Sequence, residues 1–217
     1  MRTVVYLVRH GETAGNRVLR YQPYDTPLSE AGRAQAQRVA ERLKAEPACT
    51  ALYASDLTRT LETAAAIGAA LGLDPIPEPR LRELDTGDWK GSLYDEIEAG
   101  SPGHRARWIA GGGLERLPGT AGESTADVYA RVTVAFDAIV ARHPGERVIA
   151  VSHGWAIALL LAAIYGWDYA AAFREQRVRL GNTSVTIVEA DAGGARRCTL
   201  LNCTRHLPAT ITSDGNP

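Results

Sequence analysis

Residues able to act on an anionic substrate follow several strand-like runs in this sequence. An apolar run at residues 3–8 leads into Arg9, His10 and Gly11, and a second His-Gly pair begins at His153. An imidazole beside a guanidinium is a candidate nucleophile next to an anion clamp. A histidine that merely decorates an exposed strand end is the alternative, so the motif needs support from the rest of the chain.

That support comes from the segments that follow other predicted strands. Ser55 and Arg59 follow residues 50–54, and Glu83 follows a short extended piece near residues 75–79. In a parallel sheet all strands point the same way, so their carboxyl ends share one edge, which is where open α/β sheets bind ligands. Two histidines, two arginines and one carboxylate are therefore expected to meet in one cleft.

These residue types suit phosphoryl transfer, which depends on positioning and on positive donors around the phosphoryl oxygens. Arg9 and Arg59 would supply forked, permanently charged donors. His153, at a helix start, would add a ring N–H where backbone amides already favour anions. His10 would attack phosphorus if a backbone carbonyl or carboxylate held its other N–H, and nearby positive charge would favour its neutral form. Glu83 would protonate the leaving oxygen and then activate water.

The elements that position these residues alternate between strand and helix patterns. Besides residues 3–8, the predicted strands cover residues 50–54 and 147–152, and an antiparallel pair covers 185–188 and 198–201. Predicted helices start after the caps Ser29 and Ser124, and others cover residues 57–72 and about 154–165. This order predicts one α/β domain over residues 1–217, a three-layer sandwich with a mostly parallel sheet and helices on both faces.

Three segments lack a clear pattern. Residues 14–24 are expected to form a polar loop. Residues 87–122, rich in glycine, are expected to form an irregular insertion with short helices that acts as a lid or specificity region. The tail after Leu207 is expected to be frayed.

Composition excludes several classes of partner. The formal net charge is −1, so no overall basic field favours nucleic acid or an anionic membrane. The three cysteines lack CxxC spacing, which disfavours a zinc site or a disulfide framework, and no metal or other cofactor is predicted. The apolar N-terminal run is too short for a signal peptide or a membrane span, so a cytoplasmic location is expected. A homodimer through an edge strand is left open.

The motif LVRHGET at residues 7–13 resembles the signature of the histidine phosphatase (phosphoglycerate mutase-like) superfamily. Further segments resemble successive motifs of this family, in its order: Asn16 and residues 25–32, 55–60, 83–87, 122–124, 152–154, 182–185 and 202–207. The resemblance covers nearly the whole chain and is highly specific.

The resemblance implies a phosphohistidine at His10, phosphoryl contacts from Arg9, Arg59 and His153, and an acid/base role for Glu83. It also implies substrate contacts from Asn16, Gln22 and Gly154, and no metal. Pro23 departs from the family pattern, which places a glycine after the glutamine, and this departure concerns the contacts near Gln22 rather than the chemistry.

Structural roles compete with some of these assignments. Glu83 lies among Arg80, Arg82 and Asp85, where a solvated ion pair is the alternative, and its catalytic role is the favoured one. Glu12 and Thr13 are expected to order a loop, Glu123 and Ser124 are as well explained by a helix cap, and Trp155 is expected in the core. The remaining histidines have no context that favours catalysis: His104, His143 and His206.

The sequence favours the phosphatase branch. Cofactor-dependent mutases of the family carry a longer insertion with a Glu-Arg-His-Tyr-Gly run after the acid, whereas residues 84–91 here read Leu-Asp-Thr-Gly-Asp-Trp-Lys-Gly. We therefore expect a phosphomonoesterase acting on small phosphorylated metabolites. A phosphoglycerate mutase-type transferase and a non-catalytic phosphoryl-binding member are the alternatives. No motif identifies the substrate.

Overall fold

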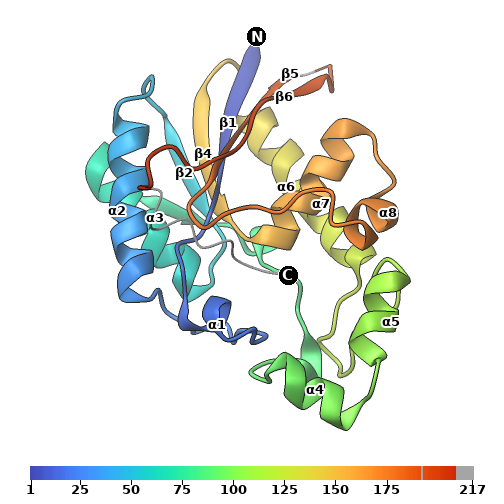
Figure 1. The fold of residues 1–217 in the computed structure, drawn as a ribbon. Coiled ribbons are helices and arrows are strands. Elements are labelled where there is room, and N and C mark those ends of the chain that lie inside the picture. The colour runs from blue at the N-terminus through green and yellow to red at the C-terminus, as the bar shows by residue number, and fades with distance from the viewer. Residues whose placement is uncertain (192, 209–217) are drawn as a thin grey trace.

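A six-stranded sheet in the order β3-β2-β4-β1-β5-β6 forms the centre of the molecule (Figure 1). The computed structural model describes residues 1–191 and 193–208 of the 217-residue chain. The strands are β1 (Arg2–Arg9), β2 (Ala51–Ala54), β3 (Pro75–Pro77), β4 (Arg147–Ser152), β5 (Val185–Asp191) and β6 (Arg196–Cys203). The first four run parallel to one another, β5 is antiparallel to β1, and β6 is antiparallel to β5. The predicted mostly parallel sheet is therefore confirmed.

Helices cover both faces of this sheet. They are α1 (Ala14–Arg17), α2 (Glu30–Lys44), α3 (Thr58–Leu71), α4 (Tyr94–Gly100), α5 (His104–Ala110), α6 (Thr125–Arg142), α7 (Gly154–Tyr165) and α8 (Tyr169–Arg174), with 3-10 turns η1 (Pro79–Leu81) and η2 (Gly87–Trp89). Ser29 and Ser124 cap α2 and α6 as predicted, each accepting a backbone N–H from the first helical turn.

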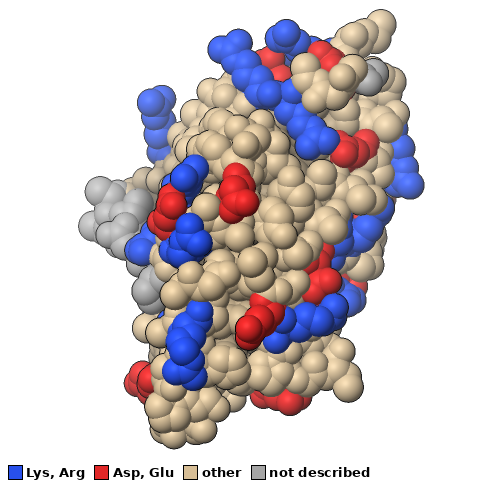
Figure 2. Space-filling model, turned by 90° about the vertical axis from the view of Figure 1, so that its right-hand side faces the viewer, with Lys and Arg blue, Asp and Glu red and all other residues tan. Residues whose placement is uncertain are grey.

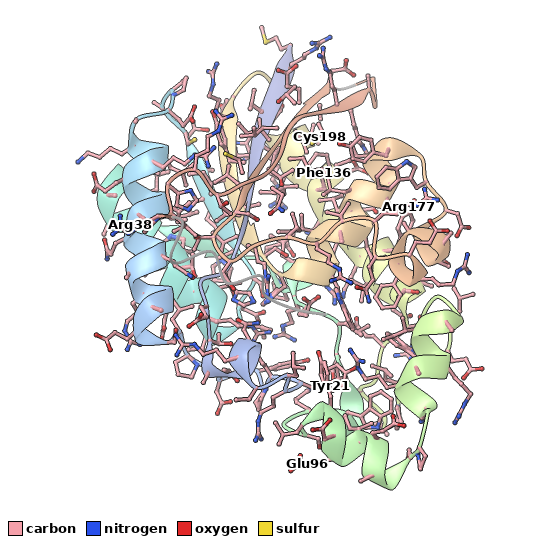
Figure 3. All side chains as sticks on the ribbon, in the orientation of Figure 1. Tyr21, Arg38, Glu96, Phe136, Arg177 and Cys198 are labelled. Carbon is pink, nitrogen blue, oxygen red and sulfur yellow. The ribbon has the colours of Figure 1, made fainter. Side chains whose placement is uncertain are left out.

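The alternation of side chains along β1 creates two cores. Tyr6 and Val8 point into a cluster with α2 and α3, whereas Val5 and Leu7 point into a larger cluster with α6 and α7. Phe136 of α6 is fully buried in the larger cluster and lies beside the sheet in Figure 3. Because both faces of the sheet are covered, the fold is the expected three-layer sandwich.

The loop after β1 passes very close to the start of α2. A Cβ on Gly11 would lie 2.5 Å from the carbonyl oxygen of Gly32, and a Cβ on Gly32 would lie 2.0 Å from that of Glu12. Glycine is therefore required at residue 11 because of this close backbone contact. A left-handed backbone is not the reason, since the φ of Gly11 lies outside that region. This contact fixes the direction in which the chain leaves β1 immediately after His10.

Residues 87–122 contain η2, α4 and α5 and lie beyond the carboxyl edge of the sheet (Figure 1). Backbone hydrogen bonds join this segment to the loop after α1: Gly91 N–H donates to Tyr21 (2.7 Å) and Tyr94 N–H donates to Leu19 (3.0 Å). In Figure 3 the labelled Tyr21 lies beside α4. Both segments contribute side chains to the pocket described below, among them Tyr21 and Tyr94.

Two short helices were not expected. α1 occupies the start of the predicted polar loop, where Thr13 caps it and Asn16 completes the capping box. α8 follows Asp168, which caps it by accepting from Ala171 N–H. The prediction of a frayed tail concerns mainly residues 209–217, which lie outside the described residues.

Charged side chains of both signs are interspersed on the face shown in Figure 2. Among residues 1–191 and 193–208, no helix combines the length and the apolar character needed to cross a membrane. Within the same residues, no three His, Cys, Asp or Glu side chains are grouped so that they could hold a metal ion.

Candidate active site

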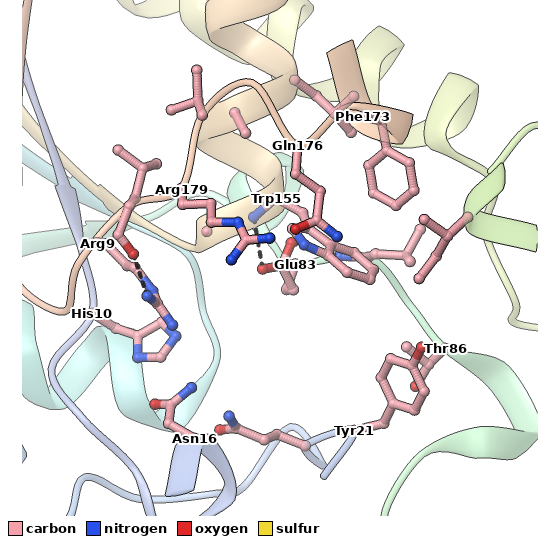
Figure 4. A pocket seen from close by; sticks show the side chains of 18 of the residues that line it. Arg9, His10, Asn16, Tyr21, Glu83, Thr86, Trp155, Phe173, Gln176 and Arg179 are labelled. Atoms are coloured by element: carbon pink, nitrogen blue, oxygen red, sulfur yellow. Dashed lines mark hydrogen bonds between the residues drawn. The ribbon is translucent and has the colours of Figure 1, made fainter. Parts of the chain in front are cut away.

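The carboxyl edge of the sheet opens into a pocket that contains most of the predicted residues (Figure 4). Arg9, His10, Arg59 and Glu83 all line it, and so does Gly154. They come from the ends of β1 and β4, from the start of α3, and from the segment after η1. The expectation that parallel strands bring these residues to one edge agrees with their placement.

His10 is held in one ring tautomer by its neighbours. Its Nδ1 lies 2.7 Å from the carbonyl oxygen of Gly11, which only accepts, so Nδ1 carries the hydrogen and Nε2 keeps its lone pair. Burial, followed by the positive charges of Arg59 and Arg9, lowers the pKa of His10 well below its ordinary value. The ring is therefore neutral at pH 7, the form in which a nitrogen can attack.

The backbone around His10 is also fixed. Its N–H donates to Ser152 (3.0 Å), and its carbonyl accepts from the Asn182 side chain (3.1 Å) and from Thr183 N–H (3.3 Å). Thr183 has a φ of 53°, a left-handed conformation that is costly for a β-branched residue. The chain thus accepts local strain where it supports the candidate nucleophile.

His153 lies behind His10, with 5.1 Å between the two ring centroids. It is fully buried, and its Nε2 lies 2.9 Å from Oγ of Ser55. The Ser55 hydroxyl accepts from Leu57 N–H and can still donate its own hydrogen to Nε2, an arrangement in which the hydrogen of His153 lies on Nδ1. Burial, followed by the charges of Arg59 and His10, lowers the pKa of His153 well below its ordinary value. His153 Nδ1 is buried and has no hydrogen-bond partner among the described residues.

Two buried guanidinium groups supply the positive charge. Arg9 donates from one terminal nitrogen to the carbonyl of Leu180, and Arg59 donates to the carbonyl of Pro23 (3.2 Å). Arg59 forms no ion pair within the described part of the chain, and its buried Nε has no partner there. Burial lowers the pKa of Arg9, and lowers that of Arg59 to about 10, so both stay charged at neutral pH. Cations this deeply buried favour a bound anion.

Glu83 accepts hydrogen bonds from the start of α7. Its carboxylate receives Trp155 N–H and Ala156 N–H, each at 3.1 Å, and also Leu84 N–H at 3.1 Å. His153, the N-cap residue of α7, provides no side-chain cap, so Glu83 satisfies the helix start instead. The competing ion-pair role is taken by other carboxylates, because Arg80 pairs with Glu78 and Arg82 pairs with Asp56.

Arg131 on α6 was missed by the sequence reasoning, although it fixes the segment that carries Glu83. It donates to the carbonyls of Arg80 (2.9 Å), Arg82 (2.6 Å) and Glu83 (2.9 Å), and it pairs with Glu123 at 2.8 Å. Glu123 is therefore a partner of Arg131, while Ser124 is the helix cap. In the sequence, this ion pair is indicated only by the spacing of eight residues between Glu123 and Arg131.

The residues expected at the substrate lie in the same pocket. Asn16 and Gln22 line it, and the amide of Asn16 points toward the cavity in Figure 4. The side-chain amide oxygen of Gln22 accepts from the Thr13 hydroxyl at 2.8 Å. Pro23, the departure from the family pattern, holds Arg59 through its carbonyl.

Other pocket residues were not predicted. Trp155 packs against the core as expected, but it also lines the pocket, together with Phe173, Gln176 and Arg179. The guanidinium of Arg179 lies between Arg9 and Glu83 in Figure 4 and forms no ion pair within the described residues. The last three come from α8 and the segment after it, where no sequence motif marked them.

The remaining histidines have structural contacts. His104 packs edge-on against Trp89, His143 bonds to Tyr53 and Glu146 at the end of α6, and His206 bonds to Thr183. None of these three lines the pocket described above.

Several known proteins are similar to this chain. The chain is 41% identical over 186 residues to "Probable phosphoglycerate mutase GpmB" of Cronobacter sakazakii, covering 85% of this chain and 84% of that protein. Bacillus stearothermophilus YhfR has a similar structure, with a TM-score of 0.85 and 35% identity, covering 94% of this chain and 98% of that one. A mycobacterial glucosyl-3-phosphoglycerate phosphatase matches with a TM-score of 0.82 and 32% identity, covering 94% of this chain and all of the other.

The family model of the histidine phosphatase superfamily (branch 1) matches residues 5–204, which include every candidate residue discussed above. The match agrees with the resemblance of the motif at residues 7–13 and with the observed sheet. The chain belongs to the histidine phosphatase superfamily.

Proposed function

We propose that this protein is a phosphomonoesterase that hydrolyses small phosphorylated metabolites through a phosphohistidine on His10. The observation that carries the proposal is the state of His10, a neutral ring whose Nδ1–H donates to Gly11 and whose Nε2 is left to attack. The buried, charged Arg59 and Arg9 beside it would bind the phosphoryl oxygens.

In the first step, His10 Nε2 forms a bond to phosphorus while the ester P–O bond breaks. The leaving oxygen takes a proton from the carboxyl group of Glu83, so the alcohol departs neutral. His153 Nδ1–H and the two arginines would stabilise the charge on the three remaining oxygens, because these donors are already fixed in a buried site.

In the second step, water attacks the phosphohistidine. The Glu83 carboxylate takes a proton from that water, the P–N bond breaks, and inorganic phosphate leaves with His10 neutral again. Glu83 ends the cycle protonated, as it began. The insertion at residues 87–122 would shape the space for the alcohol, since Tyr94 and Ile109 line the pocket from it.

A mutase is the second candidate, and the name of the Cronobacter relative favours it. A mutase returns the phosphoryl group to its substrate and must keep water out while it does so. The name of the mycobacterial structure favours hydrolysis instead. A binding protein without turnover is the third candidate, and the presence of a complete set of donor, nucleophile and acid residues argues against it.

The test is rapid mixing of the protein with a radiolabelled phosphomonoester, followed by analysis of the protein and of released phosphate. We expect an acid-labile, base-stable phosphoenzyme and steady release of phosphate, both abolished in His10→Ala. His104→Ala serves as the matched control, because His104 lies outside the pocket, and it should behave as wild type.

Two results would overturn the proposal. Interconversion of phosphoglycerates with no net release of phosphate would assign the protein to the mutases. Tight binding of phosphate without any phosphoenzyme would leave a binding protein.

A further inference from the structure

We propose that the alcohol released by this enzyme carries a flat, unsaturated ring with a hydrogen-bonding edge. The ring would lie against Trp155 and Phe173, and Gln176 would bind its polar edge. This inference rests on the phosphomonoesterase proposed above and adds the chemistry of the leaving group.

The position of Glu83 determines where the leaving group must lie. An oxygen that takes a proton from this carboxylate has to come within hydrogen-bond distance of it. The same carboxylate accepts from the backbone N–H of Trp155 at 3.1 Å, and the Trp155 side chain lines the pocket. The first carbons of the alcohol would therefore meet the Trp155 ring.

An aromatic wall continues from Trp155 away from the phosphoryl end. Phe173 packs edge-on against Trp155, with 4.9 Å between ring centroids and an angle of 82° between ring planes. Trp108 supports both rings from behind, 6.1 Å from Trp155 and 5.3 Å from Phe173, and is itself buried. Leu159 extends the apolar lining. Such a rigid apolar wall favours a ring, which would bury its face there.

Gln176 is held in an unusual state beside this wall. Its φ is 47°, a left-handed conformation that is rarely adopted without a glycine, asparagine or aspartate. Its side-chain oxygen is buried and has no hydrogen-bond partner among the described residues. Gln176 and Trp155 both line the pocket, where Figure 4 shows their side chains. Strain and an unused buried acceptor are both costly, and both occur at one residue that lines the pocket.

The side-chain amide of Gln176 can bind either a hydrogen-bond donor or an acceptor on the edge of the ring. Rotation about its last side-chain bond exchanges the carbonyl and the NH₂ group, so it can accept from a hydroxyl or donate to a ring oxygen or nitrogen. A small phosphorylated acid offers no ring to the aromatic wall. The pocket therefore favours a ring-bearing alcohol over a short hydroxy acid.

The test compares three phosphate monoesters of primary alcohols, so that the leaving oxygen stays chemically similar. Propyl phosphate has no ring, phenethyl phosphate adds a ring, and tyrosol phosphate adds a hydroxyl to the edge of that ring. For the wild-type protein we expect kcat/KM to rise about tenfold or more from propyl to phenethyl, and by a further factor of about ten from phenethyl to tyrosol.

Variants separate the two parts of the subsite. Phe173→Ala should reduce the ratio of phenethyl to propyl turnover about tenfold, and Phe173→Leu serves if the alanine variant fails to fold. Gln176→Met keeps the side-chain length and should remove the preference for tyrosol over phenethyl. Val134→Ala, on the exposed face of α6, is the control that should change neither ratio.

Equal kcat/KM values for the three esters in the wild-type protein, with His10-dependent release of phosphate intact, would overturn this inference and leave the phosphomonoesterase standing. Ratios that do not change in Phe173→Ala or Gln176→Met would overturn it as well. Failure of all three esters, together with no phosphoenzyme, would instead refute the proposed function on which it rests.

Discussion

Replacing Glu83 with glutamine tests both of its assigned roles at once. Glutamine has nearly the same shape but cannot donate the proton that an alkoxide needs. We therefore expect Glu83→Gln to slow the hydrolysis of alkyl phosphates about 100- to 10,000-fold, the usual contribution of a positioned general acid and base. A nitrophenyl ester leaves without a proton, so formation of the phosphoenzyme from it should stay fast.

The same substitution should also lower the free energy of unfolding. The carboxylate accepts three backbone N–H groups at 3.1 Å, two of them from the start of α7. In Glu83→Gln one oxygen becomes an NH₂ group, so at least one of these backbone donors loses its acceptor. We expect the free energy of unfolding to fall by about 2 kcal/mol.

Stopped-flow measurement of nitrophenolate release separates the two steps. In Glu83→Gln, a burst of about one nitrophenolate per protein should precede a slow steady phase, because the second step still needs a base to activate water. Glu175→Gln, an exposed carboxylate that pairs with Arg177, is the control and should show no such burst. Alkyl phosphate hydrolysis within about threefold of wild type in Glu83→Gln would refute the assigned role.

Three further changes follow from the geometry. Ser55→Ala removes the hydroxyl that assigns the hydrogen of His153 to Nδ1, so inhibition by vanadate should weaken about tenfold, whereas unchanged inhibition would reject that tautomer. Arg131→Met leaves three backbone carbonyls without a donor, so urea denaturation should show a free energy of unfolding lower by about 3 kcal/mol. The value of kcat should also fall, because the segment that carries Glu83 is no longer held. Burial, followed by nearby arginines, lowers the pKa of His206 to about 4, which is below its value in the unfolded chain. Because the folded protein resists protonation of His206, the free energy of unfolding should decline as the pH falls from about 6.5 to 4. The decline should be smaller in His206→Gln by about 1–3 kcal/mol, and identical pH profiles for the two proteins would contradict this.

Much of the fold could be predicted because local patterns and long-range packing agree. The alternation along β1 sends Val5 and Leu7 to one core and Tyr6 and Val8 to the other, and both cores exist. The short helices could not be predicted in this way. α1 has four residues, too few for a periodic pattern, and such helices depend on caps and tertiary contacts.

In the candidate site, too, some features could be predicted from the sequence and others could not. The sequence by itself determined the family and placed Arg9, His10, Arg59 and Glu83 at one edge, because parallel strands share a direction and the motifs follow their ends. It also predicted the kind of chemistry, since the residue types needed for it stand in successive motifs.

Only the tertiary structure decided how these groups are held and what surrounds them. The Gly11 carbonyl selects the tautomer of His10, and Arg131 fixes the Glu83 segment from a helix that is distant in sequence. Trp155 was expected in the core and also faces the pocket, where Gln176 joins it from a segment without a motif. Contacts of this kind depend on the distance between elements after folding, and no local pattern of residues encodes that distance.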